Sequence, residues 1–290
     1  MDAVRTSIEA GQAAALPLAT RPLSPALGIE VMGVDLRRPI DATLLAQLRE
    51  AWHEGLVILL RDQQLSEEDQ VRFAECFGPL GRTINVHNTG KHPAVMLISN
   101  IRKDGKPIGA LPDGEMQFHT DQCYVERPAA ATMLYAIEVP RVGGNTLFAN
   151  AYAAYETLPA EIKRRIDGKK ALNAYDYDNA STRRGTKLRE GVPHYAHPVV
   201  RTHPATGRKA LYVNRLMTLA IEGLPERESE ELLDYLFAHQ EQPRFVYEHV
   251  WRVGDILMWD NRCTLHARTD FSPTERRLMR RVTILGEKPV

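Results

Sequence analysis

The chain has 290 residues, and its 37 Lys and Arg residues are balanced by 37 Asp and Glu residues. A chain without net charge has no long-range field to attract nucleic acid or an anionic membrane, so we expect neither as a partner and favour a small molecule. Three scattered cysteines without a CxxC pair argue against a disulfide framework and a zinc ribbon, and they fit a reducing cytoplasm.

The elements expected from hydrophobic periodicity follow one another along the whole chain. Residues 1–24 predict a loosely ordered N-terminal extension, since the Ala-rich stretch is too short to span a membrane and lacks a basic segment before it. Apolar faces at helical spacing predict helices over residues 44–52, 66–77 and 226–237, the second opened by a capping-box-like Ser66 and Asp69. Short apolar runs bounded by turn residues predict strands at 56–60, 94–98, 133–137, 211–213, 256–259 and 282–285.

Many short strands with a few helices predict a mainly β core with flanking helices, of the jelly-roll or barrel kind. No linker rich in Pro, Gly or Ser divides residues 25–290, so we expect a single domain there. The polar stretch 172–197 has little periodicity and predicts a long insertion that serves as a lid.

A possible metal site begins at His119 and Asp121, which are two residues apart and would share one face of an extended strand. His266 follows 145 residues later, just after an apolar strand and the turn-like Asp260 and Asn261. Two imidazoles and one carboxylate can form the facial triad of non-haem iron(II). The same donors can also make a hydrolytic zinc site, so these three residues alone leave the metal open.

The basic segment 275–284 helps to choose between iron and zinc. If the segment is extended, residues 277, 279 and 281 share one face, which places two arginines beside the metal. Arg grips carboxylates in a bidentate manner, so Arg277 and Arg281 favour a site that holds organic acids. Arg276 and Arg280 have the opposite parity, and we interpret them as solvated, salt-bridged residues.

These motifs, in this order, resemble the taurine dioxygenase and 2,4-dichlorophenoxyacetate dioxygenase (TauD/TfdA) family of iron(II)/2-oxoglutarate oxygenases. The likeness runs from about Gly28 to the C-terminus. It includes Gly33-Val34-Asp35-Leu36, Phe77-Gly78-Pro79-Leu80, His119-Thr120-Asp121, Gly143-Gly144-Asn145-Thr146, Trp259-Asp260-Asn261-Arg262 and the Arg-rich tail.

The resemblance implies a double-stranded β-helix, or cupin-like jelly roll, that binds Fe(II), 2-oxoglutarate and O2. It makes His119, Asp121 and His266 the catalytic iron ligands. Thr146 and Arg277 then correspond to the residues that hold the distal carboxylate of 2-oxoglutarate. Arg281 matches the position that grips the anionic group of the primary substrate, so the implied reaction is oxidation of a small organic anion, with succinate and CO2 as products.

The substrate pocket departs from the taurine enzyme, because the residues that face the sulfonate there are not matched here. Four side chains are candidates to line the pocket: His87 as a replacement donor, Met217 as a soft wall, and Gln117 and Tyr124 beside the metal motif. Tyr175 and Tyr177, from the expected lid, are further candidates.

Two other functions stay open for the residues themselves: a catalytically silent metal- or ligand-binding protein of the same fold, and a zinc hydrolase. The zinc hydrolase would have no need of the paired arginines beyond His266. We further expect a cytoplasmic homo-oligomer, either a dimer or a tetramer.

Overall fold

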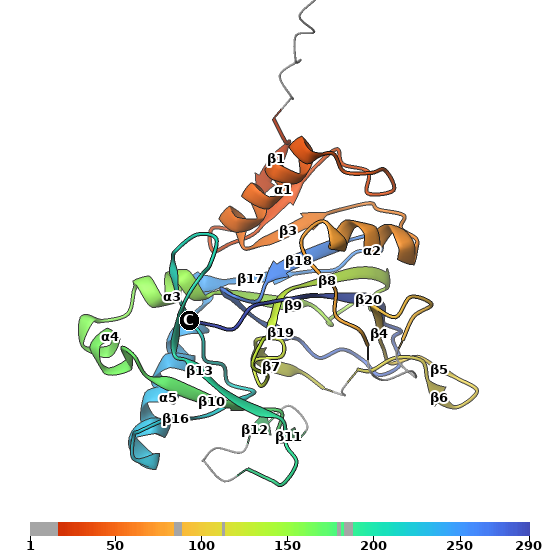
Figure 1. The fold of residues 1–290 in the computed structure, drawn as a ribbon. Coiled ribbons are helices and arrows are strands. Elements are labelled where there is room, and N and C mark those ends of the chain that lie inside the picture. The colour runs from red at the N-terminus through yellow and green to blue at the C-terminus, as the bar shows by residue number, and fades with distance from the viewer. Residues whose placement is uncertain (1–16, 84–88, 112–113, 179–180, 183–187) are drawn as a thin grey trace, which may run out of the picture.

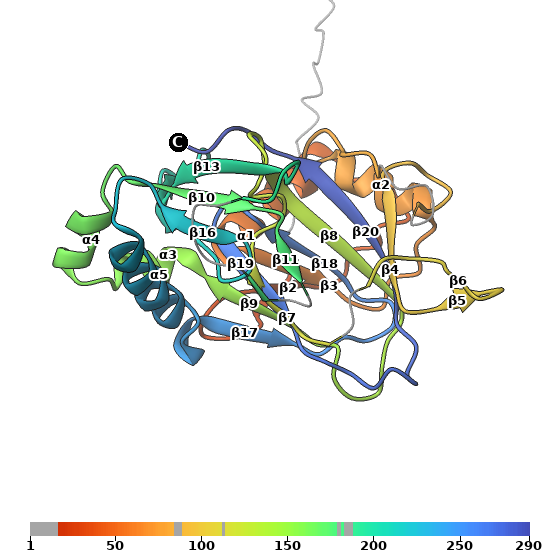
Figure 2. The same ribbon diagram turned by 90° about the horizontal axis from the view of Figure 1, so that it is seen from below.

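Two β-sheets packed face to face form the centre of the computed structural model, which describes residues 17–83, 89–111, 114–178, 181–182 and 188–290 (Figures 1 and 2). The larger sheet contains, in spatial order, β1 (Thr20–Pro22), β2 (Ile29–Val31), β3 (Val57–Leu60), β18 (Ile256–Asp260), β8 (Ala129–Glu138), β20 (Leu278–Leu285) and β4 (Val95–Ser99). The smaller sheet contains β17 (Val246–His249), β9 (Thr146–Asn150), β19 (Thr264–Arg268) and β7 (Met116–His119). Neighbouring strands in both sheets are antiparallel, except that β2 and β3 are parallel.

The central strands are buried on both faces, which explains why their sequences are continuous apolar runs. In β18, Leu257 and Trp259 point between the two sheets, where they pack in the same cluster as Phe148 of β9. Ile256 and Met258 point to the opposite face and pack against the helices.

Helices α1 (Ala42–Gly55) and α2 (Glu67–Glu75) cover that outer face of the larger sheet (Figure 1). The capping box expected at the start of α2 is present: Ser66 Oγ accepts from the Asp69 backbone N–H, and the Asp69 carboxylate accepts from the Ser66 N–H. The prediction for this helix is confirmed, because its signal is local in the sequence.

A further layer lies at the other end of the molecule, where β10 (Lys170–Ala174), β13 (His194–Pro198) and β16 (Thr218–Ile221) form a three-stranded sheet (Figures 1 and 2). Its apolar cluster also contains residues from three helices, namely α3 (Ala151–Glu156), α4 (Ala160–Ile166) and α5 (Glu226–Gln240). The remaining elements are the strand pairs β5 (Arg102–Lys103) with β6 (Lys106–Pro107), β11 (Tyr177–Asp178) with β12 (Ser181–Thr182), β14 (Val200–Thr202) with β15 (Lys209–Leu211), and the 3-10 helix η2 (Pro243–Phe245).

Three expectations from the sequence differ from this architecture. The stretch 172–197 is not a loop at its ends, because β10 and β13 pair with each other there. Residues 20–22, expected in a loose extension, form β1 and pair with β2, whereas residues 1–16 lie outside the described residues. Only Leu211 of the run 211–213 belongs to a strand.

No helix in the described part of the chain is both long enough and apolar enough to cross a membrane.

Candidate metal centre and co-substrate pocket

The two candidate histidines come from neighbouring strands of the smaller sheet. His119 is the last residue of β7, and His266 is the middle residue of β19. They are direct partners in the antiparallel register, so their side chains leave the sheet on the same face. Their ring centroids are 4.0 Å apart. Register therefore brings together two imidazoles that are far apart in the sequence.

Asp121 reaches the same point by a different route from the one expected. Strand β7 ends at His119, and Asp121 begins a turn in which Gln122 has a positive φ of 57°. The carboxylate thus converges through the turn rather than through strand alternation, which corrects that detail of the prediction. His266 Nε2 lies 3.9 Å from Asp121 Oδ1, and one donor atom from each of the three residues lies within 4.8 Å of the others.

The protonation states suit a divalent metal. Burial lowers the pKa of His119 and, together with the nearby charge of His119, lowers the pKa of His266 well below its ordinary value. Burial alone would raise the pKa of Asp121, but the charges of Arg281 and the two histidines hold it below its usual range. His119 Nδ1 donates to the Gln117 carbonyl, which leaves Nε2 with a lone pair for a metal. Neutral imidazoles and an ionised carboxylate fit iron(II).

A buried chain of hydrogen bonds connects the Asp121 carboxylate with side chains of the larger sheet and the turn that follows β18. Thr132 Oγ1 donates to Asp121 Oδ2 at 2.5 Å, Asn261 Nδ2 donates to Thr132 Oγ1 at 3.0 Å, and Trp259 Nε1 donates to Asn261 Oδ1 at 2.9 Å. Sequence reasoning gave Asn261 only a turn role and missed Thr132. The available signal was a lone hydroxyl in the apolar run at the start of β8.

A second group, His203, Asp260 and Cys263, also has its donor atoms close enough for a metal. These donors are already engaged, however. His203 Nε2 donates to Asp260 at 3.0 Å while its Nδ1 accepts from two backbone N–H groups, and Arg262 also binds the Asp260 carboxylate. Burial raises the pKa of the Cys263 thiol well above its usual value, so it is no thiolate ligand. This group therefore stabilises the fold through its hydrogen bonds and is not a second metal site.

The two residues expected to hold the co-substrate, Thr146 and Arg277, are both buried. Thr146 opens β9, and its hydroxyl accepts a hydrogen bond of 2.9 Å from Trp251 Nε1. The hydroxyl hydrogen of Thr146 is therefore available to an acceptor. Gly144 has a φ of +66°, and a Cβ added there would lie 3.6 Å from Arg277 Nε. That distance is ordinary van der Waals contact, so the positive φ, and not the nearness of the arginine, is what favours glycine here.

Arg277 is only 2% exposed, and its Nε has no hydrogen-bond partner among the described residues. Burial lowers its pKa to about 9, and the like charge of Arg268 adds to the effect. A buried guanidinium of this kind is costly unless an anion compensates it. The arrangement therefore suits a carboxylate ligand.

The alternation expected for the tail is present. Met279 packs between the sheets, and Arg281 Nη2 lies 2.9 Å from Asp121 Oδ1. Arg276 forms an exposed ion pair with Glu138, as expected. Arg280 corrects the prediction: it is buried, donates to the Leu65 carbonyl and lies over the Tyr135 ring.

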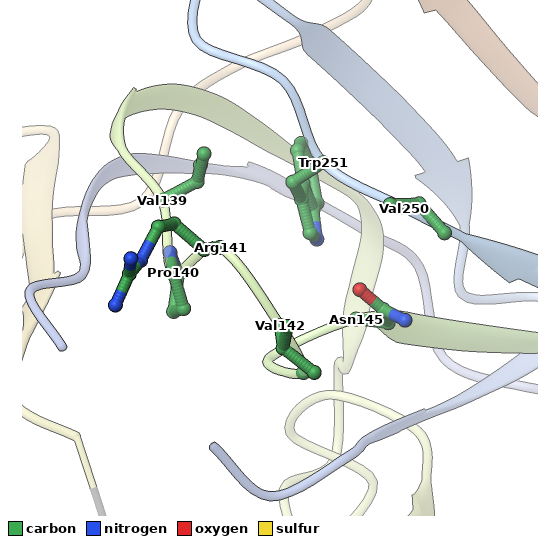
Figure 3. Close-up of a pocket in the computed structure, with 8 residues that line it drawn as sticks. Val139, Pro140, Arg141, Val142, Asn145, Val250 and Trp251 are labelled. Carbon is green, nitrogen blue, oxygen red and sulfur yellow. The ribbon is translucent and has the colours of Figure 1, made fainter. Parts of the chain in front are cut away.

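A pocket of about 240 Å³ lies on the outer side of the loop that precedes Thr146 (Figure 3). Trp251 lines it, so the indole separates this pocket from the Thr146 hydroxyl. Arg141, which also lines the pocket, is exposed and pairs with Glu275. None of the residues that line it belongs to the candidate metal site.

Of the other residues predicted to line the substrate pocket, only some lie together near the Asp121 turn. Met217 and Tyr124 belong to one small cluster, in which Met217 Sδ lies 3.6 Å from Cys123 Sγ, beside the Asp121 turn. The Tyr124 ring lies 5.0 Å from that of Tyr175. Gln117 contributes its backbone carbonyl to His119. His87 and the side chain of Tyr177 lie outside the described residues.

Fold and site together define an oxygenase centre of the two-histidine, one-carboxylate type, set in a double-layered β-sandwich beside a buried arginine. Residues 19–283 match the model of the "Taurine catabolism dioxygenase TauD, TfdA family". The chain belongs to this family.

The named relatives agree with this. The chain is 33% identical to the alpha-ketoglutarate-dependent 2,4-dichlorophenoxyacetate dioxygenase of Cupriavidus pinatubonensis, over 95% of this chain and 100% of the relative. A crystal structure of a taurine dioxygenase from Burkholderia xenovorans is 32% identical, with a TM-score of 0.80, over 95% of this chain and 91% of that one. A crystal structure of AAD-2 in complex with Mn(II) and N-oxalylglycine is 29% identical, with a TM-score of 0.78, over 94% and 99% of the two chains.

The predicted fold and enzyme class are thereby confirmed: the protein is a jelly-roll, 2-oxoglutarate-dependent non-haem iron dioxygenase. The zinc hydrolase, which the three candidate metal-binding residues alone left open, is not supported.

Proposed function

We propose that His119, Asp121 and His266 bind the iron of this dioxygenase. The observation that carries the proposal is the convergence of their donor atoms within 4.8 Å, with both imidazoles neutral and the carboxylate ionised. We further propose that Thr146 and Arg277 hold the far carboxylate of 2-oxoglutarate, and that Arg281 binds the anionic group of the primary substrate.

When bound, the iron supplies the redox chemistry with 2-oxoglutarate and O2, and the protein supplies binding and orientation. Arg277 neutralises the far carboxylate in a buried setting, where a charged hydrogen bond is strong. Thr146 donates its hydroxyl hydrogen to that carboxylate because Trp251 occupies its acceptor side. Arg281, beside Asp121, sets the substrate anion a short distance from the metal.

The primary substrate is proposed to be a small organic anion with an apolar body. Arg281 supplies the cationic contact, while Met217, Cys123 and the Tyr124–Tyr175 pair offer a soft, largely apolar wall near it. The relative from C. pinatubonensis acts on 2,4-dichlorophenoxyacetate, an anion of that description. Aryloxyalkanoates are therefore the first compounds to test, followed by alkyl sulfates, sulfonates and amino acids.

The test has two stages. Anaerobic addition of Fe(II) and 2-oxoglutarate is expected to produce a weak visible metal-to-ligand charge-transfer band, and its absence in metal-replete protein would reject the metal and co-substrate assignment. Succinate release is then screened across the four compound classes. A band without substrate-dependent succinate release from any class would favour the catalytically silent alternative.

The roles of the two arginines are separable. Arg277→Ala is expected to weaken 2-oxoglutarate binding roughly 100-fold or more, because it removes a buried charged partner. Arg281→Ala is expected to change 2-oxoglutarate binding less than about threefold while weakening the primary substrate. Titration of the charge-transfer band measures the first effect, and the KM of the substrate found in the screen measures the second. Equal loss of 2-oxoglutarate binding in both variants would contradict this division.

Three broader properties are proposed with this function. The single catalytic domain, expected from residue 25, begins with β1, because this strand belongs to the larger sheet, and the segment between β10 and β13 acts as a lid. The enzyme works in the cytoplasm, which its three free cysteines favour. It is a dimer or tetramer, which light scattering coupled to gel filtration can measure.

A further inference from the structure

His249, the last residue of β17, is buried directly opposite Thr146. The two residues are partners in the antiparallel register of β17 and β9, so their side chains leave the smaller sheet on one face, about 5 Å apart. The alternation of side chains continues past the end of β17, because Val250 is exposed and Trp251 is buried again. Neither His249 nor Trp251 was among the residues that the sequence singled out.

The imidazole of His249 is held by a hydrogen bond at each nitrogen. The Asp255 carboxylate, which accepts from Arg61 through both oxygens, also accepts from His249 Nε2 at 3.1 Å. His249 Nδ1 is then an acceptor, and the Tyr247 hydroxyl donates to it at 2.9 Å. Burial lowers the pKa of His249 and raises the pKa of Tyr247 to about 12, so the imidazole is neutral and the phenol keeps its hydrogen.

The His249 ring holds the Trp251 indole. The two ring centroids lie 4.5 Å apart with an interplanar angle of 89°, which is an edge-to-face contact. The indole Nε1 can only donate, and it donates to Thr146 Oγ1 at 2.9 Å. The Thr146 hydroxyl, which could otherwise rotate, therefore directs its hydrogen to an acceptor other than the indole.

We propose that His249 is a positioning residue for the binding of 2-oxoglutarate. It holds the Trp251 indole in place, and the indole directs the Thr146 hydroxyl hydrogen toward the far carboxylate. The proposal rests on the proposed function of Thr146. A hydroxyl that is oriented before the ligand arrives binds a carboxylate more tightly than one that must first reorient. The effects of His249 and Trp251 on 2-oxoglutarate should therefore depend on the Thr146 hydroxyl.

The test is a pair of double-mutant cycles with Thr146→Val, which removes that hydroxyl. Trp251→Phe keeps an aromatic ring and removes the N–H donor, whereas His249→Gln keeps an N–H donor for Asp255 and removes the imidazole ring. Trp52→Phe is the matched control, because Trp52 is also buried and its Nε1 has no hydrogen-bond partner among the described residues. The readout is anaerobic titration of the Fe(II) charge-transfer band with 2-oxoglutarate in metal-replete protein.

Thr146→Val is expected to weaken 2-oxoglutarate about tenfold, because it removes a hydrogen bond to a charged group. Trp251→Phe should weaken it about three- to tenfold and His249→Gln at least about twofold, while Trp52→Phe should match wild type. When Thr146→Val is already present, adding Trp251→Phe or His249→Gln should change the affinity by less than about twofold.

Equal weakening by His249→Gln with and without the Thr146 hydroxyl would indicate a merely structural role and overturn the proposal. Binding like wild type in His249→Gln would also overturn it. If His249→Gln does not fold, Tyr247→Phe decides: it removes the donor to His249 Nδ1 and must weaken 2-oxoglutarate about twofold, only when the Thr146 hydroxyl is present. Binding like wild type in Thr146→Val would instead reject the proposed function of Thr146, and the inference with it.

Discussion

Asp121 receives contacts from two directions, and each constrains a different oxygen. Oδ2 accepts from Thr132, while Oδ1 faces His266 and Arg281. Asn261 in turn fixes the Thr132 hydroxyl by donating to it, so that the hydroxyl hydrogen points to Asp121. Partners that orient a metal-binding carboxylate in this way typically contribute about 10- to 100-fold to metal affinity.

Thr132→Val keeps the shape of the side chain and removes this hydrogen bond. We expect metal affinity to fall about 10- to 100-fold, as calorimetric titration with Co(II) would measure. Thr157→Val, which removes an exposed hydroxyl at the end of α3, is the control and should bind Co(II) like wild type. Unchanged affinity in Thr132→Val would mean that Asp121 is held by its turn alone.

At the scale of helices and strands, the features that could be predicted from the sequence are those that depend on residues close together in the chain. The capping box of α2 and the alternation of residues 277, 279 and 281 depend on near neighbours along the chain, and both are present. His266 was a candidate from its place after an apolar strand and a turn, but spacing alone could not show that it lies beside β7. That link depends on the register between β19 and β7, which is a long-range pairing.

The predictions that failed involve contacts between distant segments. Arg280 is buried because the Leu65 carbonyl, 215 residues earlier in the chain, accepts its hydrogen bond. The polar ends of the stretch 172–197 become strands because Ala171 and Ala174 of β10 are buried while β13 pairs alongside. No window of neighbouring residues contains that information.

Strand β13 also holds the turn that carries Asp121. His197 Nε2 donates to the Val125 carbonyl at 2.8 Å, and burial lowers the pKa of His197 from 6.5 to about 4. The unfolded chain therefore binds a proton between pH 6.5 and about 4 that the folded chain does not bind, and stability falls as the pH falls through this window.

His197→Gln keeps an N–H donor and removes the titration. Compared with wild type, the variant should take up about one proton fewer on unfolding in this window, so its stability should depend less steeply on pH. Urea denaturation at a series of pH values between 4 and 7 measures the slope. Identical slopes for the two proteins would contradict the assignment of this pKa to His197.

At the scale of the whole molecule, the proposed metal and co-substrate site is made of residues from both sheets. The smaller sheet provides His119, His266 and Thr146. Arg277 immediately precedes β20 of the larger sheet, and Arg281 lies within β20. A ligand that contacts both sets joins the two layers, so binding should stabilise the sandwich as a unit.

Mn(II) with N-oxalylglycine, an analogue of 2-oxoglutarate, provides the measurement. At 100 times the dissociation constant, a ligand adds about 2.7 kcal/mol to the free energy of unfolding, which should raise Tm by roughly 5 to 10 °C. In Arg277→Ala, N-oxalylglycine should no longer raise Tm, whereas Mn(II) alone should still raise it. Loss of both increments would mean that the substitution damages the metal centre as well.

The placement of the tryptophans gives the protein a built-in optical reporter. Of the three in the chain, Trp259 has its ring 4.7 Å from the ring of His266, and Trp251 is hydrogen-bonded to Thr146. Trp52 instead belongs to α1 and packs against the outer face of the larger sheet. Occupation of the metal centre by a paramagnetic ion should quench the emission of Trp259, and a carboxylate bound to Thr146 should shift that of Trp251. The Trp52→Phe variant should therefore keep the full ligand-induced fluorescence change over a lower background, so that loading of the enzyme can be followed without an added dye.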